Sequence, residues 1–242
     1  METMKNDTNG KEPPTISVAP TKTKATRLIR AVHTSETVRV YQAYSDEIAD
    51  AAVESQTFVT AMEKGLWSPT RMTWIKPSKV WMAYRCGWTV LKDSKQSRVL
   101  ALDLDRTHFE KLLGQATLST HETKKGTKRP VVVQWDPERV MKNIKAPLDQ
   151  VYTKPTLAVR SIQIGLRRPA NKCLLDPKVV KRITDVTNDF RSTLQALEQG
   201  KAIDEAASLL WPSGEIETDM TVPTDISERL GMTQDGDATP AA

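Results

Sequence analysis

Apolar and polar residues alternate over residues 37–43, TVRVYQA. This pattern predicts a β-strand, because successive side chains of a strand point to opposite faces. Ser45 follows and is expected to cap a helix whose first turn carries Asp46 and Glu47. Residues 56–70, which contain a glycine and a proline, are expected to form a loop.

The next stretch repeats the change from strand to helix. RMTWI at residues 71–75 predicts a short strand, and Pro77-Ser78 then opens a helix that Gly87 should end. RVLALDLD at residues 98–105 is almost continuously apolar, which predicts a strand that is buried on both faces. A short helix is expected over residues 107–114.

The second half of the chain predicts four further features. A strand is expected at residues 131–135, and Asp136-Pro137 then begins a turn or short helix. The longest strand is expected at residues 157–166. A helix capped by Asp176-Pro177 should run to about Val186, and residues 191–210 have a helical pattern.

Strands and short helices therefore alternate through the body of the chain. This order predicts an α/β or α+β fold: a single domain with a mixed central sheet flanked by short helices. Residues 1–25 have almost no core-forming side chains and are expected to be a disordered head. The folded, catalytic domain is expected over residues 26–212, and residues 213–242 are expected to form a mobile acidic tail.

Charge is distributed unevenly along the sequence. Residues 191–242 contain 10 acidic and 3 basic residues, whereas residues 1–190 contain 32 basic and 20 acidic residues. A basic body attracts polyanions such as nucleic acid, although a solvated lysine-rich surface would have the same composition. The two cysteines favour a reducing compartment, and no apolar run approaches the ~20 residues of a spanning helix. We therefore expect a cytoplasmic protein that does not bind membranes.

Several common chemical signatures are absent from the sequence. There is no GxxxxGK[ST], no strand-linked GxGxxG and no GxSxG string. The three histidines are not spaced with Cys86 or Cys173 as metal ligands would be. We expect neither a metal ion nor a cofactor.

Four segments concentrate aromatic, cationic, amide and carboxylate side chains at expected strand ends and helix starts. They are VYQAYSDEIADAAV (40–53), RMTWIKPSKVWMAYRCGW (71–88), VQWDPERV (133–140) and VRSIQIGLRR (159–168). Ligand sites of α/β sheets often lie at such positions. Simpler interpretations remain open, since Ser78 and Asp136 could be helix caps, the tryptophans core residues, and Cys86 a small core side chain. The cations in these segments could together form an anion pocket.

These segments, followed by RITDVT, resemble in order the signature blocks of domain-of-unknown-function family 4291, from about Ile29 to Thr187. Fungal members of that family are similar to arginine-containing cyclodipeptide synthases. The resemblance implies an aminoacyltransferase that takes arginine and a second amino acid from aminoacyl-tRNAs and closes a diketopiperazine, as in secondary-metabolite biosynthesis. The chain differs from the family pattern at Lys79, where many relatives are expected to carry an aromatic or aliphatic residue.

The resemblance also implies roles for individual residues. Candidates for proton handling or transient acylation are Tyr41, Tyr44, Ser78 and Tyr84. Candidates for phosphate or oxyanion contacts are Arg71, Lys76, Arg85 and Arg160, and candidates for binding the arginine guanidinium are Asp136 and Glu138. Further substrate-binding candidates are Gln42, Trp74, Gln134, Arg139 and Gln163. The implied partners are arginyl-tRNA and a second charged tRNA, with no obligate protein partner.

Two other functions are compatible with the sequence. The strand and capped helix at residues 40–53 also resemble the opening of ADP-ribosyltransferase-like domains, which use NAD. A noncatalytic RNA-binding module would explain the basic body without any reaction.

Overall fold

The computed structural model describes residues 26–121, 128–143 and 152–232. The head expected over residues 1–25, the end of the tail and part of the basic loop lie outside these ranges. The largest sheet has the strand order β1-β8-β7-β6, and β4 pairs with β8 beside this path. Its strands are β1 (Thr26–Arg27), β4 (Thr73–Ile75), β6 (Thr117–Leu118), β7 (Val131–Met141) and β8 (Thr153–Leu166).

A second sheet has the order β3-β5-β9, and a small third sheet pairs β10 with β2. The second sheet is antiparallel, whereas the first contains both parallel and antiparallel pairs, so the predicted mixed sheet is confirmed. The strands are β3 (Thr37–Tyr44), β5 (Arg98–Asp105), β9 (Val180–Asp185), β2 (Arg30–Ala31) and β10 (Thr218–Asp219).

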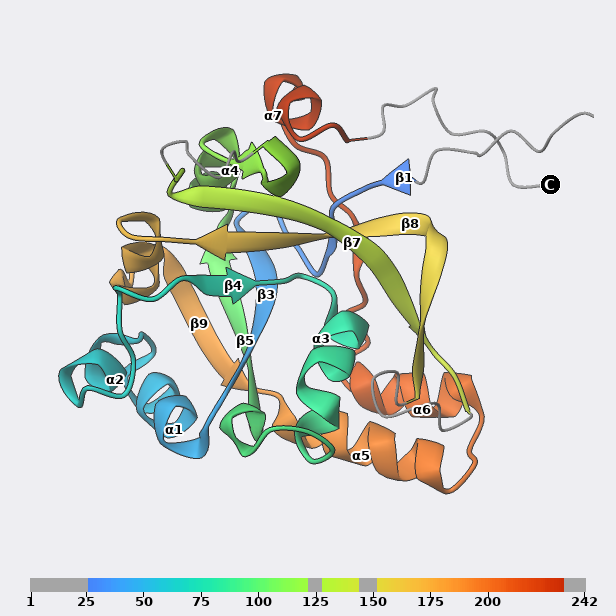
Figure 1. Cartoon of the computed structure of the whole chain (residues 1–242). Helices are drawn as coiled ribbons and strands as arrows, with labels where there is room; N and C mark the ends of the chain where they lie inside the picture. The colour runs from blue at the N-terminus through green and yellow to red at the C-terminus, as the bar shows by residue number, and fades with distance from the viewer. Residues whose placement is uncertain (1–25, 122–127, 144–151, 233–242) are drawn as a thin grey trace, which may run out of the picture.

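Helices lie around these sheets (Figure 1). They are α1 (Asp46–Ser55), α2 (Val59–Glu63), α3 (Lys79–Cys86), α4 (Arg106–Gly114), α5 (Thr187–Glu198), α6 (Ile203–Leu210) and α7 (Thr224–Arg229). Short 3-10 turns occupy Gly87–Thr89, Ser94–Gln96, Ser119–His121 and Ala170–Leu175. The described residues form a single mixed α/β domain.

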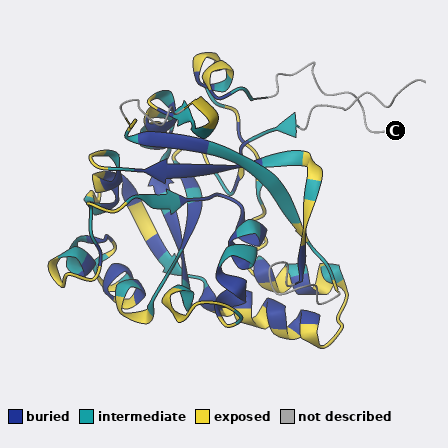
Figure 2. Cartoon of the chain, in the orientation of Figure 1, coloured by how far each residue is buried: buried dark blue, intermediate teal, exposed yellow. Residues whose placement is uncertain are grey.

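Strand β5 separates two hydrophobic cores, as its apolar run predicted. Leu100 and Leu102 face the core between the sheets, whereas Ala101 faces a second core with Phe190 of α5 and Met82 of α3. Figure 2 shows that most of this strand is buried, as is the C-terminal part of β8. Helix α3 is thereby fixed between the second core and strand β7.

Helix α3 begins and ends where its sequence predicts. Ser78 is the N-cap, and its Oγ accepts a hydrogen bond from the Trp81 amide at 3.2 Å. Gly87 ends the helix with φ 57°, a conformation that favours glycine. Ser45 likewise precedes α1, but its side chain makes no capping hydrogen bond.

Three predicted elements are wrong. The loop expected over residues 56–70 contains helix α2. Asp136-Pro137 begins no helix, because β7 continues through Pro137, whose missing amide is tolerated at a register shift between Pro137 and Arg139. The helix expected after Asp176 is a turn followed by β9, in which Val180 and Ile183 are buried against β5. Pairing with the open edge of β5 outweighs the local capping signal.

The acidic C-terminal segment differs from the expected tail over the part that the structure describes. Residues 213–232 contain β10 and α7, and Met220, Ile226 and Leu230 are buried in the core. Trp135 Nε1 donates to the Leu230 carbonyl at 2.9 Å, which attaches this segment to β7. The few apolar residues among the acidic ones are therefore sufficient to hold the segment on the domain.

Candidate functional site

Several predicted site residues meet where helix α3 begins. Lys76 and Ser78 stand immediately before the helix, and the backbone of Lys76 bridges that of Tyr41, with the Tyr41 amide donating to the Lys76 carbonyl at 2.8 Å. Ser78 Oγ donates to Glu138 Oε1 on β7 at 2.9 Å. The cap of α3 is thus joined to a strand that lies 60 residues further along the chain.

Strand β7 presents polar side chains to α3 for two reasons: its side chains alternate between the two faces of the sheet, and a register shift lies between Pro137 and Arg139. Gln134 and Asp136 lie opposite Gln163 and Ser161 of β8, on the face that turns away from the core contacts of Trp135. The register shift after Pro137 then allows both Glu138 and Arg139 to reach α3.

Lys76 is the central cation of this group. Its side chain is 1% exposed, and its Nζ lies 3.4 Å from Asp136 Oδ2 and 4.0 Å from the centroid of the Trp81 ring. Asp136 also accepts from Gln134 Nε2 at 2.8 Å. Burial lowers the pKa of Lys76 to about 8, while Asp136 and Glu138 oppose that shift. Lys76 can therefore gain or lose a proton near neutral pH.

Glu217 joins this group from the C-terminal segment and was not predicted. Its Oε1 accepts from the Lys79 amide, the first of α3, at 2.7 Å. Burial, together with the nearby charge of Glu138, raises the pKa of Glu217 to about 8. We call Lys76, Ser78, Asp136, Glu138 and Glu217 the lysine–carboxylate cluster. No local motif marks Glu217, because it lies 138 residues from its partner.

A second set of predicted residues packs on the side of α3. The Arg139 guanidinium lies 3.2 Å from the centroid of the Tyr84 ring, and Tyr84 meets Trp81 edge-on with centroids 5.8 Å apart. Arg85 donates to Gln163 Oε1 at 2.9 Å, and burial lowers the pKa of Arg85. These contacts place Tyr84, Arg85, Arg139 and Gln163 beside the cluster.

The predicted tyrosines of β3 separate into two environments. Tyr41 is 1% exposed in the second core, and burial raises its pKa well above the usual value. Tyr44 faces the other way, and its hydroxyl donates to Gln42 Oε1 at 3.0 Å. Gln42 Nε2 in turn donates to Thr73 Oγ1 and to the Trp74 carbonyl. The buried phenol of Tyr41 is thus poorly placed to handle protons.

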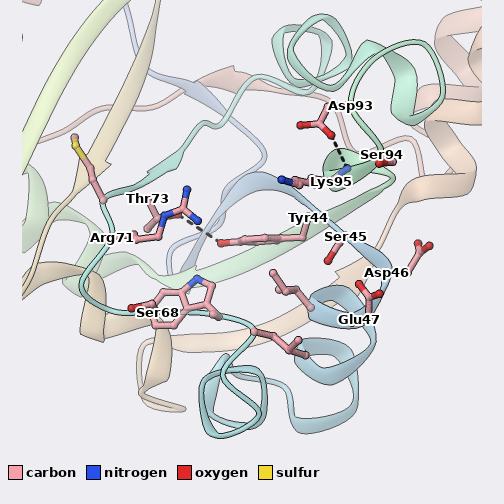
Figure 3. Close-up of a pocket in the computed structure, with 14 residues that line it drawn as sticks. Tyr44, Ser45, Asp46, Glu47, Ser68, Arg71, Thr73, Asp93, Ser94 and Lys95 are labelled. Atoms are coloured by element: carbon pink, nitrogen blue, oxygen red, sulfur yellow. Dashed lines mark hydrogen bonds between the residues drawn. The ribbon is translucent and has the colours of Figure 1, made fainter.

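Tyr44 lines an open cleft of about 810 Å³ at the start of α1 (Figure 3). Arg71 and Thr73 line the same cleft, as do Lys95 and Asp93 from the short turn before β5. Its apolar wall consists of Tyr44, Ile48, Leu66, Trp67 and Met72. Of the predicted site residues, the cleft therefore collects Tyr44 and Arg71.

Two predicted residues have other positions. Arg160 is on β8 next to Ser161, so its side chain points to the opposite face from Ser161 and Gln163. Trp74 packs on Gly165 of β8, where an added Cβ would come within 2.9 Å of its ring. We therefore assign Trp74 to packing, and Arg160 lies outside the cluster.

Lys79 and Cys86 have structural surroundings. The Lys79 ammonium donates to Asp189 Oδ2 at 2.7 Å and to the Leu210 carbonyl at 2.5 Å, which joins α3 to α5 and α6. Cys86 is buried in the second core, and burial raises its pKa to about 11. In the described ranges, no three His, Cys, Asp or Glu side chains are grouped to hold a metal ion. Nor does any helix in those ranges have the length and apolar character to cross a membrane.

The fold and the site define a mixed α/β domain that has a partly buried lysine–carboxylate cluster and an open cleft. The chain belongs to the family described as Domain of unknown function (DUF4291), whose model matches residues 28–215. This match covers the cluster except for Glu217, and it covers the whole cleft. No curated protein matches the chain.

Proposed function

We propose that this protein is a tRNA-dependent synthase of arginine-containing cyclic dipeptides. The observation that supports this proposal most strongly is the lysine–carboxylate cluster, in which Asp136 and Glu138 converge on Lys76 and Ser78. Together these residues supply carboxylates for a cationic substrate side chain and groups that can transfer a proton. The resemblance of the sequence segments to the fungal synthases gives the reaction class.

The carboxylate of Glu138 is suited to bind the substrate guanidinium. Its Oε1 already accepts from Ser78 Oγ and from the Arg139 amide, which fixes the side chain. Its Oε2 makes no hydrogen bond to any described residue, and the residue is only partly buried. A planar guanidinium gains both direction and charge neutralisation from such a fixed carboxylate. Asp136 lies two residues earlier on the same face of β7.

The reaction needs proton transfer but no other reagent. The amine of one aminoacyl group attacks the ester carbonyl of the other, an amide bond forms, the ester bond breaks, and the 3′-oxygen of the tRNA leaves with a proton. A second attack within the dipeptide closes the ring in the same way. Ser78 is the hydroxyl for a transient acyl group or a proton relay. Lys76, whose pKa is about 8, sets the charge of the cluster in which these steps occur.

The proposal is tested by reconstituting the reaction. Purified protein is mixed with tRNA, arginyl-tRNA synthetase, a second synthetase, ATP and the amino acids, and small molecules are identified by mass spectrometry. We expect an arginine-containing diketopiperazine that disappears when ribonuclease is added first. Product that survives ribonuclease, or no product with any second amino acid, would contradict the proposal.

Glu138→Gln identifies the residue that holds arginine. Removing one member of a charged pair in a desolvated site typically costs about 2–5 kcal/mol of binding. The variant should keep the circular dichroism spectrum of the wild type and lose most use of arginyl-tRNA. Glu63→Gln, a matched change of an exposed residue on α2, should leave activity unchanged. Wild-type activity of Glu138→Gln would place the guanidinium elsewhere.

A second candidate function is NAD-dependent ADP-ribosyl transfer. The cleft favours it, because it opens where β3 meets α1, the segment that resembles the opening of ADP-ribosyltransferase-like domains. Release of nicotinamide from NAD by the purified protein is the direct test. Binding of tRNA with neither reaction would leave the noncatalytic RNA-binding module.

A further inference from the structure

The cleft beside Tyr44 contains two cationic side chains without ionic partners. Neither the Arg71 guanidinium nor the Lys95 ammonium forms a hydrogen bond or ion pair with any described residue. Figure 3 shows that they approach from different segments and that both lie near the Tyr44 ring. Both residues are exposed, so their charges are accessible to an anion from solvent.

The backbone that carries each cation is held in place by the fold. Asn171, which is fully buried, donates from Nδ2 to the carbonyls of Pro69 and Arg71 at 2.7 and 3.0 Å. Asp93 Oδ1 accepts from the Lys95 amide at 2.9 Å and fixes the turn at Lys95. These hydrogen bonds fix both segments, so that binding would require little ordering of the backbone.

Three carboxylates, those of Asp46, Glu47 and Asp93, also line the cleft. Asp46 accepts from Ser97 Oγ at 3.1 Å and lies 3.7 Å from Arg98, and neither of these partners lines the cleft. In Figure 3, Asp46 and Glu47 lie at the far end from Arg71. Arg71 thus lies at the end of the cleft away from Asp46 and Glu47, next to the apolar wall.

We propose that this cleft binds a nucleotide, with Arg71 and Lys95 on the phosphate and the base or ribose against the apolar wall. The assignment rests on the proposed function for its source of nucleotide, which is the single-stranded 3′ end of the tRNA. Single-stranded nucleic acid is held by this combination of cations along the backbone and apolar or aromatic surface under the bases. The volume of about 810 Å³ lies within the range of about 300–1,000 Å³ that is typical of small-ligand sites.

The cleft and the cluster are connected through the protein interior. Tyr44 bonds to Gln42, Gln42 bonds to the backbone of β4, and β4 leads directly to Lys76. Arg85 also acts on the pKa values of both Tyr44 and Lys76 by its charge. The cleft and the cluster are thus neighbouring parts of the domain that share Arg85 as a nearby charge.

Binding is measured with a 5′-fluorescein single-stranded RNA that ends in CCA, by fluorescence anisotropy at several salt concentrations. The double variant Arg71→Ala/Lys95→Ala should bind at least about tenfold more weakly. The slope of log K against log salt should become shallower by about 0.7 for each phosphate that the variant no longer neutralises. Lys178→Ala, a change of an exposed lysine outside the cleft lining, should match the wild type.

The other arms of the experiment identify the source of the nucleotide. Unlabelled CCA-ending RNA should compete, whereas blunt duplex RNA, NAD and inorganic phosphate should compete at least about tenfold more weakly. Equal affinity and salt slope in the double variant, or stronger competition by NAD than by RNA, would overturn the assignment. Because no aminoacyl group is present, a protein that binds RNA through the cleft but makes no dipeptide would disprove only the proposed function.

Discussion

The lysine–carboxylate cluster lies where β4 leads into α3, and the cleft lies where β3 leads into α1; a serine precedes each helix. The two regions differ in how many of their polar groups form hydrogen bonds or ion pairs within the protein. In the cluster, Ser78 caps α3 and bonds to Glu138, and Glu217 accepts from the first amide of the helix. In the cleft, Ser45 makes no capping bond and Arg71 has no ionic partner among the described residues.

This difference indicates different tasks. A group of charges that is largely satisfied within the protein can be buried, and burial shifts its proton affinities, as the pKa values of Lys76 and Glu217 show. An open cleft with unpaired cations contributes little to folding and remains available for a ligand. The comparison therefore predicts that substitutions in the cluster change stability, whereas substitutions in the cleft change binding alone.

The largest expected effect on stability is that of Asp136→Asn. Removing one partner of a buried pair leaves Lys76 without its counter-charge, which should cost about 3–5 kcal/mol of unfolding free energy near neutral pH. The pair is charged below the Lys76 pKa of about 8, so the cost should shrink as the pH rises through that value. Urea unfolding at pH 6.5 and pH 9 measures the difference in unfolding free energy between variant and wild type, and Asp204→Asn, a change of an exposed residue, is the control. A cost that does not change with pH would show that Lys76 is not the partner affected.

Gly165→Ala should have the next largest effect. The new Cβ would meet Met72 and lie 2.9 Å from two ring atoms of Trp74. Met72 can move aside, but the ring is held on β4, so we expect a loss of about 1–3 kcal/mol. Gly114→Ala provides a matched control, since its Cβ would meet only Ile226, at 3.9 Å. Thermal unfolding that is equal for the two variants would contradict the close packing of Trp74 on β8.

Glu217→Gln should alter the pH dependence of stability more than its magnitude. The folded protein keeps the proton of Glu217 up to about pH 8, whereas the unfolded chain loses it near 4.5. The wild type therefore binds more protons when folded within this window, so this residue makes stability fall as the pH rises from about 4.5 to 8. The difference in unfolding free energy between variant and wild type, followed from pH 5 to pH 8, should show that slope. A flat difference would mean that Glu217 is exposed in solution.

Substitution of the cleft cations should have the smallest effect on stability. Arg71→Ala and Lys95→Ala each remove a side chain without an ionic partner, so each should change the unfolding free energy by less than about 0.5 kcal/mol. Chemical denaturation checks this directly. A loss above about 1 kcal/mol would indicate that these side chains support the fold and would weaken the distinction between cleft and cluster.

The sequence predicted the strong local signals and failed where distant pairing decided the structure. Helix α3, with its serine cap and terminal glycine, and the two-sided burial of β5 followed from local pattern. Residues 136–141 and 180–185 are strands despite local helix signals, because each pairs with an available strand edge. Those partners lie far away along the chain and leave no mark in the local sequence.

The candidate site was predictable to a similar extent. The cations of the four segments were expected to share an anion pocket, but Lys76 pairs with Asp136 and, of these cations, only Arg71 lines the cleft. Residue types alone could not separate the buried Tyr41 from the cleft-lining Tyr44, which differ by the face of one strand. Glu217 and Lys95 were missed because their roles arise from folding of the C-terminal segment and of a short turn.

We propose that the cluster acts on the aminoacyl groups while the cleft binds the RNA that carries them. Steady-state synthesis of cyclic dipeptide from arginyl-tRNA tests it most directly, by comparing Glu138→Gln with Arg71→Ala/Lys95→Ala. We predict that the first variant loses turnover with arginyl-tRNA while still binding uncharged tRNA. The second should raise the KM for charged tRNA at least about tenfold and keep kcat close to the wild-type value. Loss of kcat in the cleft variant, or unchanged kinetics in Glu138→Gln, would contradict this division of roles.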